Sequence, residues 1–190
     1  MYGLSTFLYG LGFFFPPLFL PTFVGAVGEG PKSGALCLAV MAVAQVVGQL
    51  AFGYLSDKSM SVSVLAITCS LVGTTASLTL WGLAKSLAPL VLFSVVYGFF
   101  AYGFTSMRVA MGRAVSDDAS AAVATYSLLV FLQGIGNVLA GPLSGLLVKG
   151  VVGGGYGLGR YKMLVGFTGS CLLGSAVVIG VWHLRPKGVR

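Results

Sequence analysis

The sequence predicts an all-α membrane protein with six transmembrane helices. Apolar residues make up 57% of the 190 residues and charged residues only 8%, whereas soluble domains average about 25% charged. The charged residues are also spaced so that six stretches of 22 to 30 residues contain none. A helix that crosses the hydrocarbon core needs about 20 mostly apolar residues. Every one of these stretches is therefore long enough to span a bilayer.

Short polar segments separate the stretches and set the order of the helices. Charged residues occur with Gly, Pro or Ser at 28–32 and 56–59, and a glycine-rich segment at 149–160 precedes the last helix. We expect one six-helix bundle over residues 1–190, and an even number of spans leaves both ends on the same side. The expected helices are about 3–27, 35–56, 62–84, 87–110, 121–148 and 161–184.

Prolines and glycines predict how two of these helices behave. Pro16, Pro17 and Pro21 lie in the first helix. Proline lacks a backbone donor, and a carbonyl freed in lipid needs a partner from another helix or from cavity water. We therefore expect the first helix to bend and to face protein or a cavity, either as a fixed kink or as a moving gate. Gly141 and Gly145 on the fifth helix predict close helix packing.

Composition and charge exclude several classes of function. The cysteines and the single histidine have no metal-ligand spacing, and all four acidic residues lie in predicted loops. We therefore expect no catalytic residue, no metal, no cofactor and no enzyme activity. The net charge of +7 is scattered over the loops, which indicates membrane topology and not nucleic-acid binding.

Loop charge leaves the orientation of the chain nearly open. Six basic residues fall on the side of the two termini and five on the other side. The positive-inside rule therefore favours cytoplasmic termini only slightly. Three of the six are Arg185, Lys187 and Arg190, which follow the last helix directly.

Polar side chains inside the spans are the candidates for a solute pathway. Gln45 and Gln49 on the second helix are four residues apart, as are Gln133 and Asn137 on the fifth, so each pair shares a helix face. A buried amide is costly without a partner. Each pair therefore either bonds to another helix or lines a wet pathway. Tyr97, on the aromatic fourth helix, is a further pathway candidate, with packing or lipid contact as the alternative.

The segment after the second helix carries the most specific pattern in the chain. Gly53, Leu55, Asp57 and Lys58 form a Gly-x-Leu-x-Asp-Lys sequence. It resembles the loop signature of the major facilitator superfamily, which lies in the cytoplasm between the second and third helices of each six-helix half. Its acid is expected to pair near the end of a neighbouring helix. In this chain Ser59 follows, where the family pattern usually continues with glycine and basic residues.

Two further segments extend this resemblance over nearly the whole chain. Residues 15–23 are similar to the seventh helix of fungal monocarboxylate-transporter-like members, and residues 160–162 are similar to the entry of their last helix. The resemblance implies the C-terminal half of a twelve-helix bundle, with both termini in the cytoplasm. The plasma membrane and an organelle membrane stay equally open.

The resemblance also implies a function and partners in the lipid bilayer. Such a half would work by alternating access around a midplane site, on a small organic substrate such as a monocarboxylate-like metabolite. It would need a missing N-terminal six-helix half or a second copy as its partner. The alternative is a truncated six-helix membrane protein with a structural or assembly role and no transport by itself.

The second helix departs from its apparent relatives at the two amide positions. Related transporters often carry an arginine just after the glycine of this helix, and animal proton-coupled members add an acid one turn earlier. Here Gln49 follows Gly48, and Gln45 stands one turn earlier. Because amides do not titrate near pH 7, we expect this pair to take up no proton.

Overall fold

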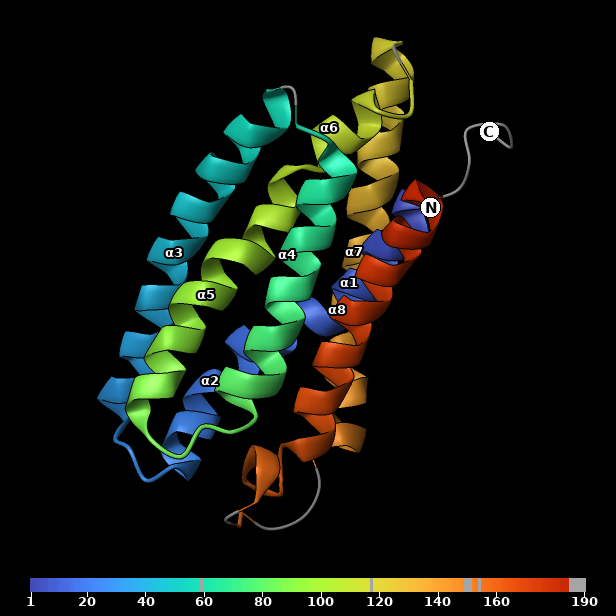
Figure 1. Ribbon diagram of the computed structural model, residues 1–190. Coiled ribbons are helices and arrows are strands. Elements are labelled where there is room, and N and C mark those ends of the chain that lie inside the picture. The colour runs from blue at the N-terminus through green and yellow to red at the C-terminus, as the bar shows by residue number, and fades with distance from the viewer. Residues whose placement is uncertain (59, 117, 149–151, 154, 185–190) are drawn as a thin grey trace.

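The computed structural model describes residues 1–58, 60–116, 118–148, 152–153 and 155–184 (Figure 1). Within them it contains helices and no strand, and six helical segments are long and apolar enough to cross a membrane. The predicted all-α membrane fold is confirmed. The elements are α1 (Tyr2–Phe13), α2 (Phe15–Ala26), α3 (Pro31–Asp57), α4 (Val62–Ala76), η1 (Ser77–Trp81), α5 (Leu87–Ser106), α6 (Arg108–Arg113), α7 (Ala119–Leu147), η2 (Tyr156–Leu158) and α8 (Lys162–His183).

The first span is divided into two helices, α1 and α2, which meet at Phe14. Pro17 cannot donate to the carbonyl of Phe13, four residues earlier. The Oη of Tyr97 on α5 donates a hydrogen bond to that oxygen at 3.0 Å. The prolines therefore interrupt this helix as expected, and a freed carbonyl finds its partner on a neighbouring helix, as a bilayer requires.

The third and fourth spans are also irregular, which the sequence did not predict. The third span, Val62–Trp81, ends in the π-helical turn η1. Met107 separates α5 from α6, so the fourth span reaches Arg113, beyond the expected end at residue 110. Large side chains fill the core beside η1: the buried Trp81 ring lies 6.0 Å from the Phe23 ring and 5.6 Å from the Phe93 ring, between centroids.

The long helices α3, α5, α4, α8, α1 and α7 form a row of neighbours in this order, and α2, the second part of the first span, packs against α3 (Figure 1). The helices α3 and α7 stand at the two ends of this row. Of their most apolar 18 residues, only 22% and 17% are buried inside the chain, against 44–50% for the other four spans. The chain therefore leaves most of the surface of α3 and α7 to lipid or to a partner.

Glycines allow close helix contact at both ends of the row. A Cβ on Gly98 of α5 would lie 2.6 Å from the Met41 carbonyl oxygen on α3, and one on Gly136 of α7 would lie 2.7 Å from the Gly10 backbone on α1. The expected close packing at Gly141 and Gly145 is wrong for this chain, because a Cβ on either would meet nothing within 4 Å. The α1–α7 contact lies one turn or more before them, at Gly136.

Both ends of the described chain lie at the same end of the bundle. Met1 and His183 line one pocket together with Met60 and Ala114, which belong to the segments after α3 and α6. The even number of spans accounts for this arrangement. The basic residues 185, 187 and 190 used to judge orientation lie outside the described part of the chain.

Candidate functional site

Two amides lie at the contact of α7 with α1 and have no hydrogen-bond partner among the described residues. Gln133 is only 4% exposed, and a Cβ on Gly10 of α1 would lie 2.8 Å from its backbone oxygen. Within the described chain, the buried Oε1 of Gln133 and Oδ1 of Asn137 accept no hydrogen bond. A buried acceptor without a partner costs about 1–3 kcal/mol. Water, a solute or a partner subunit would lower this cost by donating a hydrogen bond.

The second amide pair lies on α3, beside its contact with α5. Gln45 and Gln49 are half-buried and make no hydrogen bond to any described residue. They stand one turn apart, about 6 Å along the axis. By helical spacing they flank the buried stripe of Met41, Gly48 and Phe52. Both predicted amide pairs therefore lie on the two helices that the chain itself covers least.

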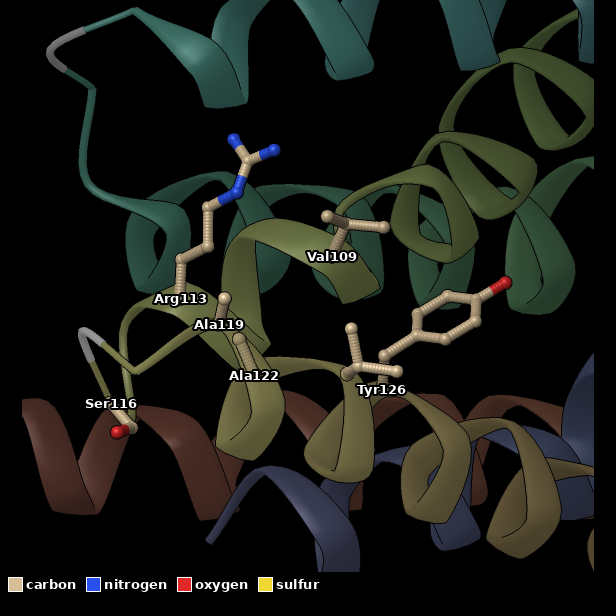
Figure 2. Close-up of a pocket in the computed structure, with 7 residues that line it drawn as sticks. Val109, Arg113, Ser116, Ala119, Ala122 and Tyr126 are labelled. Atoms are coloured by element: carbon tan, nitrogen blue, oxygen red, sulfur yellow. The ribbon is translucent and has the colours of Figure 1, made fainter.

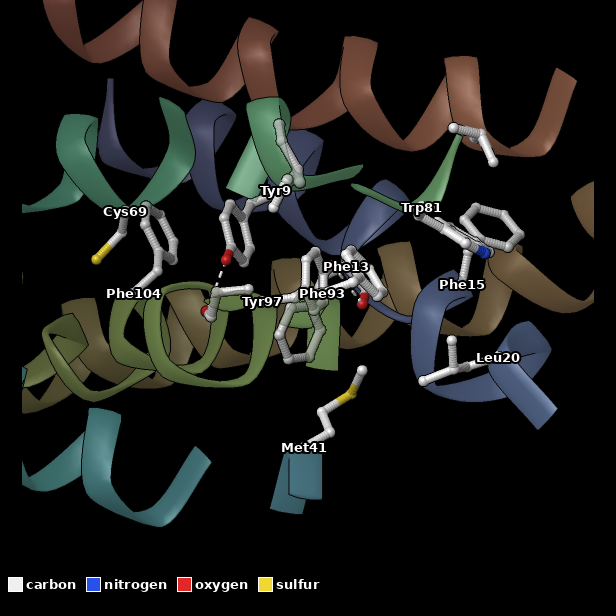
Figure 3. Close-up of a cluster of buried hydrophobic side chains, with 14 of the residues drawn as sticks. Tyr9, Phe13, Phe15, Leu20, Met41, Cys69, Trp81, Phe93, Tyr97 and Phe104 are labelled. Atoms are coloured by element: carbon white, nitrogen blue, oxygen red, sulfur yellow. Dashed lines mark hydrogen bonds between the residues drawn. The ribbon is translucent and has the colours of Figure 1, made fainter. Parts of the chain in front are cut away.

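Tyr97 lies in the core between α5 and α1 (Figure 3). It is fully buried, and its hydroxyl donates a hydrogen bond to the Phe13 carbonyl. Tyr9 makes the reciprocal contact from α1, donating to the Ala101 carbonyl at 2.6 Å and stacking on Phe104 with centroids 3.9 Å apart. These contacts give Tyr97 a packing role in this conformation, and its part in a pathway stays a prediction.

The acid of the loop motif joins the ends of two helices. Asp57, the last residue of α3, accepts a hydrogen bond from Nη1 of Arg113, the last residue of α6, at 3.2 Å. The two side chains are 67% and 66% exposed. The expected pairing of Asp57 with a neighbouring helix end is confirmed. An ion pair this exposed adds at most about 1 kcal/mol of stability, so its value lies in positioning.

The other motif residues make looser contacts. Lys58 places its Nζ 4.7 Å from the centroid of the Tyr54 ring. Leu55 is partly buried and packs against the core. A Cβ on Gly53 would meet nothing within 4 Å, so within this chain Gly53 is not a point of close helix contact. Whether these residues act in function stays a prediction.

A pocket of about 510 Å³ opens between α6 and α7, beside Arg113 (Figure 2). In Figure 2 the Arg113 guanidinium points away from α7, toward the end of α3 with which it pairs. The pocket is lined by Val109, Arg113, Ser116, Ala119, Ala122, Val123 and Tyr126. Its wall is apolar apart from Ser116, Tyr126 and Arg113, and the Arg113 guanidinium is already paired with Asp57.

Sequence reasoning did not single out Arg108 as a site residue, although the expected helix 87–110 contains it, and counted it only among the basic residues on the side of the termini. In the structure this arginine is half-buried at the break between α5 and α6, inside the span Leu87–Arg113. A 20-residue helix without charge ends two residues before it, and the break at Met107 has no proline to signal it. Charge inside a span marks a functional candidate, so the expected bounds of this helix could already have pointed to Arg108.

The chemistry available at this site is that of binding. Among the described residues, no three His, Cys, Asp or Glu side chains are grouped to hold a metal. Amide, phenol and guanidinium groups instead lie along α3, α7 and the α5–α6 break. The six apolar spans of the described chain define a polytopic membrane protein, and these polar groups are its candidates for solute binding.

Comparison with known proteins identifies its relatives as transporters of the major facilitator superfamily (MFS). The chain is 27% identical over 181 residues to an MFS-type transporter of Gibberella moniliformis, covering 94% of this chain and 41% of that protein. It is 28% identical over 192 residues to monocarboxylate transporter 13 of Rattus norvegicus, covering 96% and 41%. It is 24% identical over 179 residues to the MFS transporter asaE of Aspergillus flavus, covering 94% and 39%. No family model matches the chain.

These similarities confirm the resemblance predicted from the loop motif and the first helix. They support an integral, multi-pass membrane protein with a role in transport, and these relatives are named as transporters and not as enzymes. The chain spans about 40% of the length of the relatives it matches.

Proposed function

We propose that this chain is the C-terminal six-helix half of a facilitator-type transporter and carries a small organic solute, a monocarboxylate-like metabolite, by alternating access. The observation that carries this proposal is the similarity over 94–96% of the chain to about 40% of transporters, one of them named for monocarboxylates. In transporters built from repeated halves, the solute binds between the halves near the middle of the membrane.

The uncovered helices support the need for a second half. Val43 and Leu50 on α3 are 67% and 71% exposed, and Phe131 and Val138 on α7 are 65% and 75% exposed. Lipid chains would cover such apolar side chains as well as protein would. Acyl chains cannot, however, satisfy the four unpaired amides on the same two helices. A second half or a second copy would enclose these amides in a shared polar cavity.

The ends of the bundle support alternating access with both termini in the cytoplasm. Rocking of one half against the other needs contacts that hold helix ends together within each half. The Asp57–Arg113 pair joins α3 to α6 at the end where both chain ends lie. This end corresponds to the cytoplasmic loop of the family signature, which gives the proposed orientation.

Reconstitution tests the proposal directly. The chain would be purified and placed in liposomes alone, at high density to favour pairing, or together with an N-terminal six-helix half from a full-length relative. We expect saturable uptake of labelled monocarboxylates in the paired preparations and little in dilute, unpaired chain. Absence of uptake in every preparation, with the proteins shown to be inserted and associated, contradicts transport.

Gln45 provides a sharper test of the pathway. Gln45→Leu removes an amide that has no partner in the chain, so we expect a several-fold change in substrate affinity or rate at unchanged protein abundance. Val46→Leu, one residue further on the exposed surface, is the matched control. Because amides do not titrate near pH 7, the wild-type pair should contribute no pH dependence. Equal kinetics in both variants would assign Gln45 to packing.

The little-covered helices α3 and α7 also fit one alternative, a structural or assembly role beside full-length relatives. In that case the chain associates with a full-length transporter without adding uptake of its own. Co-purification combined with unchanged uptake per transporter would support this role over transport.

A further inference from the structure

The segment between α6 and α7 carries a serine beside the Asp57–Arg113 ion pair. Ser116 follows Arg113 by three residues, and its backbone N–H donates to the Gly112 carbonyl at 3.3 Å. The helical turn at the end of α6 therefore continues to this serine, which places the Cβ atoms of Arg113 and Ser116 about 5–6 Å apart. Both residues line the pocket of about 510 Å³ in Figure 2, so there is room beside them for an added group.

The Ser116 hydroxyl is accessible and holds no contact as a donor. The residue is partly exposed. Its Oγ accepts a hydrogen bond from the Asp118 backbone N–H at 3.2 Å and donates none to a described residue. The sequence also places a cation, Arg113, three residues before the hydroxyl. A basic residue at this spacing is the charge pattern by which arginine-directed serine kinases select their substrates.

Two other exposed serines at this end of the bundle fit that pattern less well. The residue three positions before Ser120 is the acidic Asp117. Ser61 follows Lys58 by three residues, but it is the N-cap of α4, and a lysine lacks the forked donors of arginine. Ser116 is therefore the best candidate for modification among these three serines.

A phosphate on Ser116 would compete with Asp57 for the Arg113 guanidinium. It carries about −1.5 to −2 charge at pH 7 and three acceptor oxygens, and arginine binds phosphate through two parallel hydrogen bonds. The existing pair with Asp57 is two-thirds exposed on both sides, so it is weakly held. One guanidinium cannot neutralise both groups, and the phosphate also repels the Asp57 carboxylate.

The other charges at this end leave Arg113 as the best-placed partner of such a phosphate. The positive end of the α7 dipole lies close by and favours a negative group. Asp118 opposes it, but its carboxylate is already used as the cap of α7. The Lys58 ammonium lies 4.7 Å from the centroid of the Tyr54 ring. A phosphate on Ser116 would therefore bind Arg113, its neighbour along the turn.

We propose that Ser116 is a phosphorylation site, and that its phosphate takes Arg113 from Asp57 and so releases the end of α3 from the end of α6. The proposal rests on the transport function and cytoplasmic orientation proposed above, because ATP and protein kinases act in the cytoplasm, and it adds a means of regulation. The Ser116 Oγ attacks the γ-phosphorus of ATP. The new O–P bond forms as the bond to the ADP oxygen breaks, and the hydroxyl proton passes to the catalytic base of the kinase.

Phosphorylation of the purified chain in detergent tests the site. An arginine-directed serine kinase and Mg–ATP are added, and the modified residues are mapped by mass spectrometry. We expect phosphate on Ser116 in wild type, at least tenfold less phosphate in Ser116→Ala, and the wild-type amount in the matched control Ser120→Ala. Phosphate mainly on Ser61 or Ser120, or none in wild type, overturns the assignment.

The release of α3 is measured as a distance between spin labels by double electron–electron resonance. The labels are placed on cysteines at the exposed Leu50 of α3 and at Ala114 after α6, with the three native cysteines replaced by alanine. We expect a longer or broader distance after phosphorylation and in Ser116→Glu, and the wild-type distance in its uncharged counterpart Ser116→Gln. In Asp57→Asn the pair is already broken, so phosphorylation should add no further change. An unchanged distance in the phosphorylated chain, or an equal change in Ser116→Gln, overturns the switch.

Sealed vesicles test whether the kinase can reach the site in a cell. Kinase and Mg–ATP added outside should modify Ser116 in inside-out vesicles and leave right-side-out vesicles unmodified. The reverse result overturns the proposal, because cytoplasmic ATP would then not reach this serine.

Uptake with the partner half separates regulation from transport. We expect the phosphorylated chain to carry substrate several-fold more slowly than the unmodified chain, as for Asp57→Asn. Uptake unaffected by complete phosphorylation refutes the regulation alone. Absence of uptake together with a phosphate-dependent distance change refutes transport alone.

Discussion

We expect the exposed charge of Asp57 to matter more for movement than for folding. Its pair with Arg113 is about two-thirds exposed on both sides, so its loss should cost at most about 1 kcal/mol of stability. It nevertheless fixes the end of α3 to the end of α6. In a complete transporter context we expect Asp57→Asn to reduce uptake several-fold while membrane insertion and thermal stability stay as in wild type. Unchanged uptake at equal surface expression would remove the motif from the mechanism.

Tyr97 makes the opposite kind of contribution, to stability. Tyr97→Phe keeps the ring but removes the hydroxyl that donates to the Phe13 carbonyl. Pro17 has no N–H to replace this donor. We expect a loss of about 1–3 kcal/mol, measured by unfolding in detergent micelles. Tyr161→Phe is the matched control, because that buried ring makes no hydrogen bond through its hydroxyl to a described residue. Equal stability of the two variants would show that the Phe13 carbonyl finds another donor.

For single residues, the sequence predicts which polar side chains stand out better than it predicts which residues they contact. The amides stood out because polar groups are rare in apolar stretches, and the structure does leave them unpaired. The partner of Tyr97 lies 84 residues away and depends on how α1 packs on α5. The break at Met107 beside Arg108 likewise has no proline to mark it, although the expected helix 87–110 already contains this arginine.

At the scale of helices, α7 offers a test of close packing within a few residues. A Cβ on Gly136 would press on the Gly10 backbone at 2.7 Å, whereas one on Gly134 meets nothing within 4 Å. We expect Gly136→Ala to destabilise the chain by about 1–3 kcal/mol, since backbone atoms must move apart. Gly134→Ala should be neutral or should stabilise by up to about 1 kcal/mol through helix propensity. Thermal unfolding in detergent compares the two, and the reverse order would place the α1–α7 contact elsewhere.

Proline predicts a helix break better than glycine predicts a close helix contact. Proline acts on its own backbone, so the division of the first span at Phe14 could be predicted from the sequence. A glycine only permits close approach, and 29 glycines offer many choices. The Gly-xxx-Gly spacing pointed to Gly141 and Gly145, while the contact forms at Gly136, where α1 crosses α7.

For the whole molecule, the spacing of charge determined the number of spans but not their direction. Fifteen charged residues, eleven basic and four acidic, are too few to interrupt six apolar stretches, so the six-helix fold was predictable. A six-to-five division of basic residues gives almost no preference for one orientation. The family loop at Asp57 is the stronger argument, and it is the basis for our proposal that this end of the bundle faces the cytoplasm.

Orientation can be measured with tags on residues 1 and 190 and a third tag inserted after Lys85. Met1 and His183 lie at the same end of the bundle as the segment after α3, so we expect both terminal tags on the side of Asp57, whereas the segment after Lys85 lies between the third and fourth spans, on the opposite side. In sealed cells or right-side-out vesicles we expect external protease to remove only the tag after Lys85. Cleavage of both terminal tags with protection of the third would invert the topology, and with it the assignment of Asp57 to a cytoplasmic loop. Cleavage of one terminal tag alone requires an odd number of spans, which would mean that one of the six apolar helices does not cross the membrane.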